Sequence, residues 1–232
     1  MTANRVYLDH AATTDILPAA IDAMVQQMRT GGNPSSLHAT GREARAAVEY
    51  ARERIAQAIG CDAAEVIFTS GGTEADNLAV KGMYWKCHSA DPARRRILVS
   101  SIEHHAVEET CEWLETHQGA VIEWIPVDAQ GLVHPDTVRE LIAKNPADVA
   151  LVTVMWANNE VGTIQPIAEI AQLAAEYGIP MHSDAVQAFG AVPVNFRESQ
   201  VTTLAISGHK IGGPMGVGAL IATRSADMTP VL

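Results

Sequence analysis

The sequence has few cysteines, few basic residues and no long apolar run. Its three cysteines, Cys61, Cys87 and Cys111, form no CxxC pair, so their spacing indicates neither a disulfide framework nor a zinc site. Lys and Arg number 16 against 27 Asp and Glu, which disfavours a nucleic-acid surface because such surfaces need clustered positive charge. No apolar stretch approaches the ~18 residues that span a bilayer, and the N-terminus lacks a signal-peptide pattern. We therefore expect a reduced, cytoplasmic protein without membrane contact.

Hydrophobic residues make up 47% of the chain and form short runs that alternate with amphipathic stretches. Seven runs bounded by turn-forming residues predict strands: Val66–Thr69, Ile97–Ser100, Val121–Val127, Ala150–Met155, Pro180–Ser183, Thr203–Ser207 and Val217–Ala222. Five longer stretches predict helices: Glu43–Ile59, Thr73–Lys86, His105–Thr116, Pro135–Lys144 and Ile167–Tyr177. This alternation indicates an α/β fold, with a mainly parallel seven-stranded sheet between two helical layers. The strands are apolar enough to be buried on both faces, and the last two are candidates for an antiparallel pair.

The first forty residues differ in character from the rest. The segments DHAATT (9–14) and GGNPSS (31–36) are polar and turn-forming, and they flank one short helix. We predict that residues 1–15 form an N-terminal arm laid against a large domain of residues 16–232. In open parallel sheets, ligands bind beyond the carboxyl ends of the strands, so the chemistry of this chain should lie where its strands end.

The first such place is the turn Ser70–Thr73, which leads from a strand into a helix. Gly71 and Gly72 let the backbone approach a ligand closely, and the helix start offers free N–H groups and a positive dipole end. This pattern predicts an anion site, most naturally for a phosphate. An ordinary turn capped by Ser or Thr explains the same residues equally well.

Two further strand ends carry polar side chains. His104 follows one strand, where an imidazole can stack on a flat ring or move protons, although a surface loop histidine is the simpler interpretation. Asn158 and Asn159 follow the strand Ala150–Met155, where amides can donate to a phenolic or carboxylate oxygen. Asn is also common in turns, so the chemical and the structural interpretations both stay open.

Asp184 ends another strand, and Gln187 follows three residues later. A partly buried carboxylate needs a cationic partner, and a protonated pyridine nitrogen would serve. The competing interpretation is a metal site that includes His182. The spacing suggests no third ligand, so we expect no metal.

Lys210 lies in the segment Ser207–Pro214, at the end of a strand and before a glycine turn. We expect desolvation and neighbouring cations to lower its pKa, which makes the neutral amine a nucleophile toward an aldehyde. Ser207 and His209 beside it could contact a phosphate. A lysine reaching from a loop into solvent is the alternative, but it leaves the other strand ends unexplained. A phosphate site, a stacking histidine, a ring-nitrogen carboxylate and a desolvated lysine together predict pyridoxal 5'-phosphate (PLP), held by Lys210 as a Schiff base.

In sequence order the motifs DHAATT, GNPSS, FTSGGTEADN, EHHAV, NNEVG, HSDAVQ and SGHK resemble the class V aminotransferase-like cysteine desulfurases, the group that includes NifS and IscS. The resemblance runs from about Tyr7 to Thr223. It implies fold-type I and a PLP-dependent homodimer in which this chain is the PLP-binding large domain. It also implies conversion of L-cysteine to L-alanine, with a persulfide formed on an enzyme cysteine. The sulfur would go to an iron–sulfur scaffold, to tRNA thiolation or to another carrier protein.

The resemblance also implies roles for individual residues. Lys210 and His104 match catalytic positions, with His104 stacked on the PLP ring. Cofactor contacts fall on nine positions: Gly72, Thr73, Ser207 and His209 at the phosphate, His104 on the ring, Asp184 at the pyridine nitrogen, Gln187 at the phenolic oxygen, Asn159, and Lys210. Substrate contacts fall on Asn159 and on Asn33 in GNPSS.

The chain departs from the family in its length, because members continue into a smaller C-terminal domain. That domain carries the arginine that clamps the substrate carboxylate and the cysteine that accepts sulfur. None of the three cysteines present lies in a matching motif, so we expect them to be structural or incidental and the chain alone not to turn over cysteine. The alternatives are another class V enzyme, such as a selenocysteine lyase, a kynureninase-like hydrolase or an aminotransferase, and a non-catalytic PLP-binding fragment.

Overall fold

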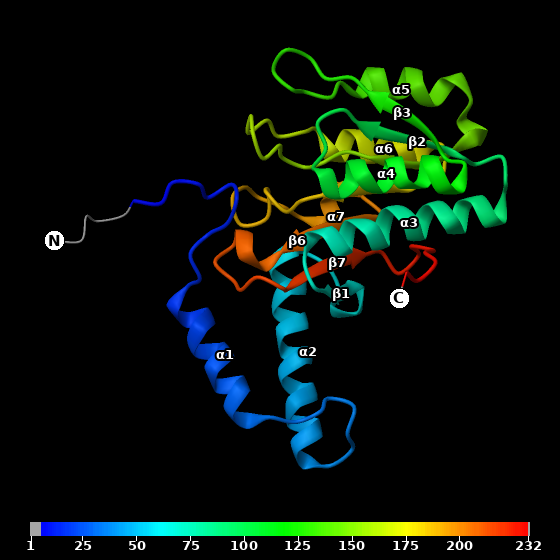
Figure 1. Cartoon of the computed structure of the whole chain (residues 1–232). Coiled ribbons are helices and arrows are strands. Elements are labelled where there is room, and N and C mark those ends of the chain that lie inside the picture. Colours follow the sequence, from blue (N-terminus) through cyan, green and yellow to red (C-terminus); the bar gives the residue numbers. More distant parts are fainter. Residues whose placement is uncertain (1–5, 232) are drawn as a thin grey trace.

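The computed structural model describes residues 6–231 and forms a sheet with helices on both faces (Figure 1). The strands are β1 (Val66–Thr69), β2 (Arg96–Ser100), β3 (Val121–Ile125), β4 (Val149–Thr153), β5 (Met181–Asp184), β6 (Thr203–Ser207) and β7 (Gly218–Ala222). The helices are α1 (Pro18–Thr30), α2 (Ala39–Ile59), α3 (Gly72–Ala90), α4 (His105–Gln118), α5 (Pro135–Lys144), α6 (Ile167–Glu176) and α7 (Phe196–Ser199). Single 3-10 turns lie at Ala63–Glu65, Pro146–Asp148 and Gly208–Lys210. Across residues 6–231, each helix is too short or too polar to cross a bilayer.

The seven strands lie in the order β1-β7-β6-β5-β4-β2-β3. The five strands from β6 to β3 are parallel, and β7 runs antiparallel to both β6 and β1. The predicted α/β fold with a mainly parallel seven-stranded sheet is therefore confirmed, as is the antiparallel pairing of the last two strands. Parallel strands need crossover connections, and the helices that make them cover both faces of the sheet.

The core lies on the two faces of the sheet, and alternate residues of one strand serve each face. On β2, Ile97 and Val99 pack under α3 and α4, whereas Leu98 packs on the side of α5 and α6. Edge strand β3 corrects the prediction that every strand is buried on both sides, because its Val121 and Trp124 are 42% and 41% exposed. β3 also ends at Ile125, earlier than predicted, because the proline that follows cannot donate to the ladder.

Helices α1 and α2, called here the helix pair (residues 18–59), have few partners within the described chain. α1 contains no buried residue, and only Gly41, Ala56 and Ile59 of α2 are buried. Figure 1 shows the pair projecting away from the sheet. Apolar side chains such as Val25 and Met28 are 38% and 76% exposed there.

The segment of residues 6–17 runs along the turn that follows β6. Thr14 donates to the His209 carbonyl from both its backbone nitrogen and its Oγ1, each at 2.9 Å. Leu17 N donates to Gly212 O at 2.8 Å, and Gly212 N donates to Thr14 Oγ1 at 2.8 Å. These bonds fix the N-terminal segment beside the turn that carries Lys210.

Candidate active site

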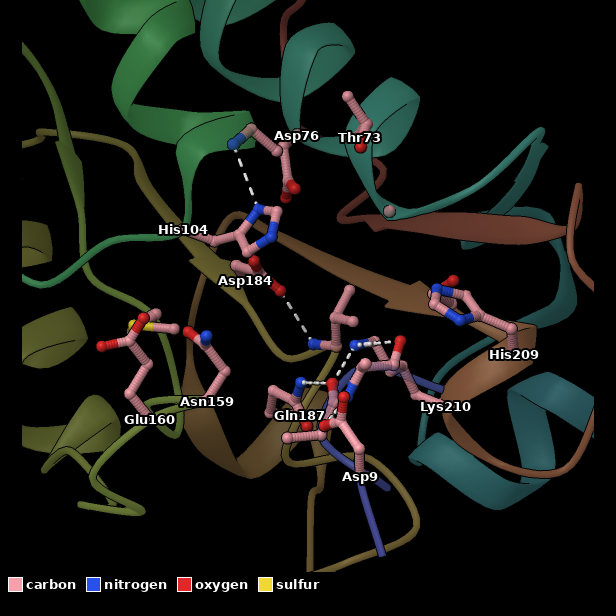
Figure 2. Close-up of a pocket in the computed structure, with 17 residues that line it drawn as sticks. Asp9, Thr73, Asp76, His104, Asn159, Glu160, Asp184, Gln187, His209 and Lys210 are labelled. Atoms are coloured by element: carbon pink, nitrogen blue, oxygen red, sulfur yellow. Dashed lines mark hydrogen bonds between the residues drawn. The ribbon is translucent and has the colours of Figure 1, made fainter. Parts of the chain in front are cut away.

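A cavity of about 550 Å³ opens at the carboxyl ends of the parallel strands, between the N-terminus of α3 and the segment of residues 6–17. Nine of the ten predicted site residues line it (Figure 2): Gly72, Thr73, His104, Asn159, Asp184, Gln187, Ser207, His209 and Lys210. These residues come from five separate stretches of sequence. The parallel topology brings them together, because it places the carboxyl ends of the strands at one edge of the sheet.

One end of the cavity is the start of α3, where no side chain caps the helix. A Cβ on Gly72 would lie 2.7 Å from Val186 Cγ2, so the close packing at this point excludes a larger residue. Ser207 lies next to Gly72, and its Oγ is buried and has no hydrogen-bond partner within the described chain. Buried hydroxyls normally find a partner, so free N–H groups and an unpaired hydroxyl here fit a bound anion such as a phosphate.

Asp184 ends β5 on the floor of the cavity and is only 5% exposed. Its Oδ1 accepts a hydrogen bond from Val186 N at 2.8 Å. Burial, followed by the nearby Asp76 carboxylate, raises the pKa of Asp184 to about 7. Because the pKa of this carboxyl is near neutral, a cation that binds beside it makes it anionic.

His104 begins α4 as its N-cap. Its Nδ1 accepts from Ala106 N at 3.1 Å, so the unprotonated nitrogen is fixed and only Nε2 is free to carry a hydrogen. Figure 2 shows the ring next to the Asp184 carboxyl. The helix cap therefore fixes the direction of the imidazole at the cavity wall.

Lys210 lies in the 3-10 turn after β6, and its Nζ reaches the segment of residues 6–17. It donates to the carbonyls of Ala11 and Ala12, the second at 3.0 Å, and Gln187 Nε2 also donates to Ala11 O, at 2.8 Å. Burial lowers the pKa of Lys210, while the Asp184 and then the Asp9 carboxylates oppose that effect. The expectation that neighbouring cations lower the pKa of Lys210 is therefore wrong, because the charged groups that act on the amine are carboxylates and desolvation alone lowers its pKa.

The two asparagines after β4 have different surroundings. Asn159 lines the cavity, whereas the Asn158 amide donates to Ile102 O at 2.9 Å. Glu103 makes a second link between the same loops, since its Oε1 accepts from Met155 N at 2.6 Å. Asn158 and Glu103 therefore tie the loop of His104 to the loop of Asn159.

Asn33 is the predicted site residue that the structure does not bring to the cavity. It lies in the loop between α1 and α2, where its Oδ1 accepts from Ser35 N at 2.9 Å. The helix pair carries this loop away from the sheet (Figure 1). The substrate contact implied for Asn33 stays a prediction without a cavity contact in the described chain.

Sequence reasoning missed three acids of this region, Asp9, Asp76 and Glu103. Asp9 and Asp76 line the cavity, and burial raises the pKa of Glu103 well above its usual range. Asp76 could have been found, because it lies one helical turn before Val80 on the buried face of α3, where a carboxyl is unusual.

The three cysteines lie outside the cavity lining. Burial raises the pKa of Cys61 to about 11 and also raises the pKa of Cys87 and of Cys111. The thiolate is the nucleophilic form, so these side chains are poor sulfur acceptors.

Comparisons with known proteins agree on one family. The sequence profile of "Aminotransferase class-V" matches residues 6–232. The chain is 54% identical over 226 residues to an IscS-like cysteine desulfurase of Mycobacterium tuberculosis, covering 97% of this chain and 57% of that protein. It is 46% identical to the cysteine desulfurase IscS of Dictyoglomus turgidum, covering 98% and 56%. The chain thus spans about half the length of the curated relatives it matches.

Solved structures are similar as well. A structure described as a NifS-like protein superposes with a TM-score of 0.90 at 34% identity, covering 98% of this chain and 61% of that one. A structure of SspA in complex with cysteine gives a TM-score of 0.91 at 35% identity, covering 98% and 65%. The fold of this chain therefore has counterparts in proteins of known structure.

Proposed function

This chain belongs to the class V aminotransferase family, and from that premise we propose that it is the PLP-binding part of a cysteine desulfurase. The reaction is conversion of L-cysteine to L-alanine, with the sulfur passed to a cysteine thiolate. The desulfurases among the relatives favour this activity over the other class V reactions. The neighbouring structure of SspA, solved with cysteine, supports the substrate.

The observation that carries the proposal is the buried Ser207 Oγ, which lies beside the start of α3 and has no hydrogen-bond partner among residues 6–231. Gly72, Thr73, Ser207 and His209 would hold the PLP phosphate there. Asp184 would hold the ring nitrogen, Gln187 the phenolic oxygen and Lys210 the aldehyde carbon. His104 and Asn159 would contact the ring. When bound, PLP supplies the electron sink that stabilises negative charge at the substrate α-carbon.

The residues of the chain have separate tasks in this reaction. Lys210 Nζ would take a proton from the substrate α-carbon and later return one. The carbonyls of Ala11 and Ala12 hold that amine at the cavity wall. Asp184 would offer a negative charge to a protonated ring nitrogen. His104, with only Nε2 free, is placed to move a proton beside the ring.

The sulfur acceptor and the assembly are further parts of the proposal. The raised pKa values of Cys61, Cys87 and Cys111 argue that the thiolate is none of these three. We propose a homodimer in the cytoplasm that delivers sulfur to an iron–sulfur scaffold or another carrier protein. Family membership supports these statements.

The test is binding and covalent trapping of PLP on this chain. We expect PLP to give a visible absorbance band and borohydride to fix the cofactor on Lys210, located by peptide mapping. Lys210→Ala should abolish both, because no other amine lines the cavity among the described residues. Lys86→Ala is the control, since Lys86 Nζ pairs with Asp227 on the surface at 3.1 Å. Trapping on the Lys210→Ala chain, or no binding by the wild type, would contradict the proposal.

A further inference from the structure

A row of polar side chains lies buried beneath α3, on a face of the sheet that is mainly apolar. His182 on β5 is completely buried, and both ring nitrogens are engaged: Nε2 with Asp76 Oδ1 at 3.1 Å and Nδ1 with Thr203 Oγ1 at 2.9 Å. Asp76, on α3, is 1% exposed and reaches the cavity floor. Burying an acid and an imidazole is costly unless both are satisfied, so this row needs a defined proton arrangement.

One arrangement satisfies every member of the row without a buried charge. Burial raises the pKa of Asp76 well above its usual range and lowers the pKa of His182 to about 4. A protonated Asp76 then donates to His182 Nε2. His182 Nδ1–H donates in turn to Thr203 Oγ1, whose own hydrogen points toward Met83 Sδ at 3.9 Å. A buried ion pair would instead have to overcome the desolvation of two charges.

The state of Asp76 matters because a second carboxyl shares the cavity floor. His182 and Asp184 are two residues apart on β5, so their side chains leave the same face of the strand. The negative charge of an ionised Asp76 is the second cause, after burial, of the raised pKa of Asp184. A protonated Asp76 removes that repulsion, so Asp184 ionises more readily.

The other titratable groups around this floor come from four segments. Asp9 lies in the segment of residues 6–17, and Glu160 lies in the loop after β4. Glu103 and His104 lie in the loop after β2, and Lys210 lies in the turn after β6. Burial and then the Asp184 carboxylate raise the pKa of Glu103 well above its usual range. At Asp184 the Val186 N–H and the imidazoles of His182 and His104 oppose the effect of burial and lower the pKa.

We propose that Asp76 is a positioning residue that stays protonated by donating its hydrogen to His182, so that Asp184 alone offers a negative charge to the cofactor ring nitrogen. The role of Asp76 toward the cofactor rests on the proposed function. The proton arrangement itself is a property of the chain without cofactor.

The first test replaces each aspartate by the amide of the same shape. Asp76→Asn keeps a donor to His182 Nε2, so the dissociation constant for PLP should stay within about threefold of wild type. Asp184→Asn loses a charged hydrogen bond, so the constant should rise at least about tenfold. Both are measured by absorbance titration on chains whose folding is checked by circular dichroism. Equal losses in the two variants, or loss of folding in Asp76→Asn alone, would overturn the proposal.

The second test needs no cofactor. Long-range ¹H–¹⁵N spectra report the tautomer of each histidine, and His182→Gln identifies the signal of His182. We expect the neutral Nδ1–H form from pH 5.5 to 8, unchanged in Asp76→Asn. A charged imidazole or the Nε2–H form in this range would refute the arrangement. If the wild-type chain bound no PLP, the proposed function would be wrong. The spectrum would still decide whether Asp76 is protonated, because it needs no cofactor.

Discussion

Helices α1 and α3 differ in what covers them. α3 buries eight of its residues against the sheet and α4, whereas α1 buries none. The N-terminus of α3 also forms one end of the cavity. Periodicity in sequence therefore predicts that a helix forms, but not which neighbour receives its apolar face. The residues that line the cavity come from the sheet with its packed helices and from the segment of residues 6–17. Asn33, the predicted site residue that does not line the cavity, lies in the helix pair.

The largest expected effect on the free energy of unfolding comes from comparing a Leu to Ala substitution in the sheet with one in the helix pair. Leu98→Ala on β2 removes a completely buried side chain, so we expect the free energy of unfolding to fall by about 3 kcal/mol. Leu37→Ala, in the loop of the helix pair, truncates a side chain that is 89% exposed and should change it by less than about 0.5 kcal/mol. Urea unfolding of both variants checks this. Similar losses would mean that another surface covers Leu37 in solution.

A substitution at the cavity floor should have a smaller effect on the free energy of unfolding, and one of opposite sign. The pKa of Asp184 is about 7 in the folded chain against an ordinary value of 3.8, so the folded state holds a proton that the unfolded chain has released. Stability therefore falls as pH rises between about 4 and 7. Asp184→Asn should weaken that dependence, to which the raised pKa values of Asp76 and Glu103 also contribute, and stabilise the cofactor-free chain by roughly 2 kcal/mol at pH 7.

The measurement is urea unfolding at pH 5 and pH 7.5, with the exposed Asp15→Asn as control. The wild type and the control should lose more stability between the two pH values than Asp184→Asn does. A carboxyl that destabilises the chain at the position where a ligand cation is expected is typical of a binding site. An Asp184→Asn chain less stable than wild type at pH 7.5 would contradict this account.

The smallest effect concerns the two asparagines predicted to contact substrate or cofactor. Asn159 lines the cavity and Asn33 does not. Asn159→Ala should raise the dissociation constant for PLP about threefold or more, because it removes a polar contact, whereas Asn33→Ala should leave it unchanged within the error of an absorbance titration. Equal weakening by both would place the loop of Asn33 at the cavity in solution.

Much of the sheet could be predicted from the sequence, because short apolar runs bounded by turn residues have few alternatives in an α/β chain. The bounds of β1, β6 and α5 coincide with the prediction. The prediction from sequence missed helix α7, because its four residues after the Asn195 cap are too few to show a helical period.

The site was harder to predict beyond its motifs. Turn residues at strand ends mark candidates such as Asp184 and Lys210, because topology brings strand ends together. Asp76 carries no such mark, since its role depends on facing His182 from a helix more than a hundred residues away in sequence. Asn33 shows the reverse, because a motif identifies a residue type and spacing but not the direction in which a helix pair carries it.

The contact between Lys210 and the Ala11 carbonyl also bears on how the chain matures. The two residues are separated by 199 positions in sequence, so a ribosome must add nearly every residue described here before they can meet. Closing so long a loop is slow compared with local pairing, and N-terminal segments emerge first. The wall that holds the amine is therefore among the last contacts to form within residues 6–231, and cofactor loading should follow synthesis of this region rather than guide it.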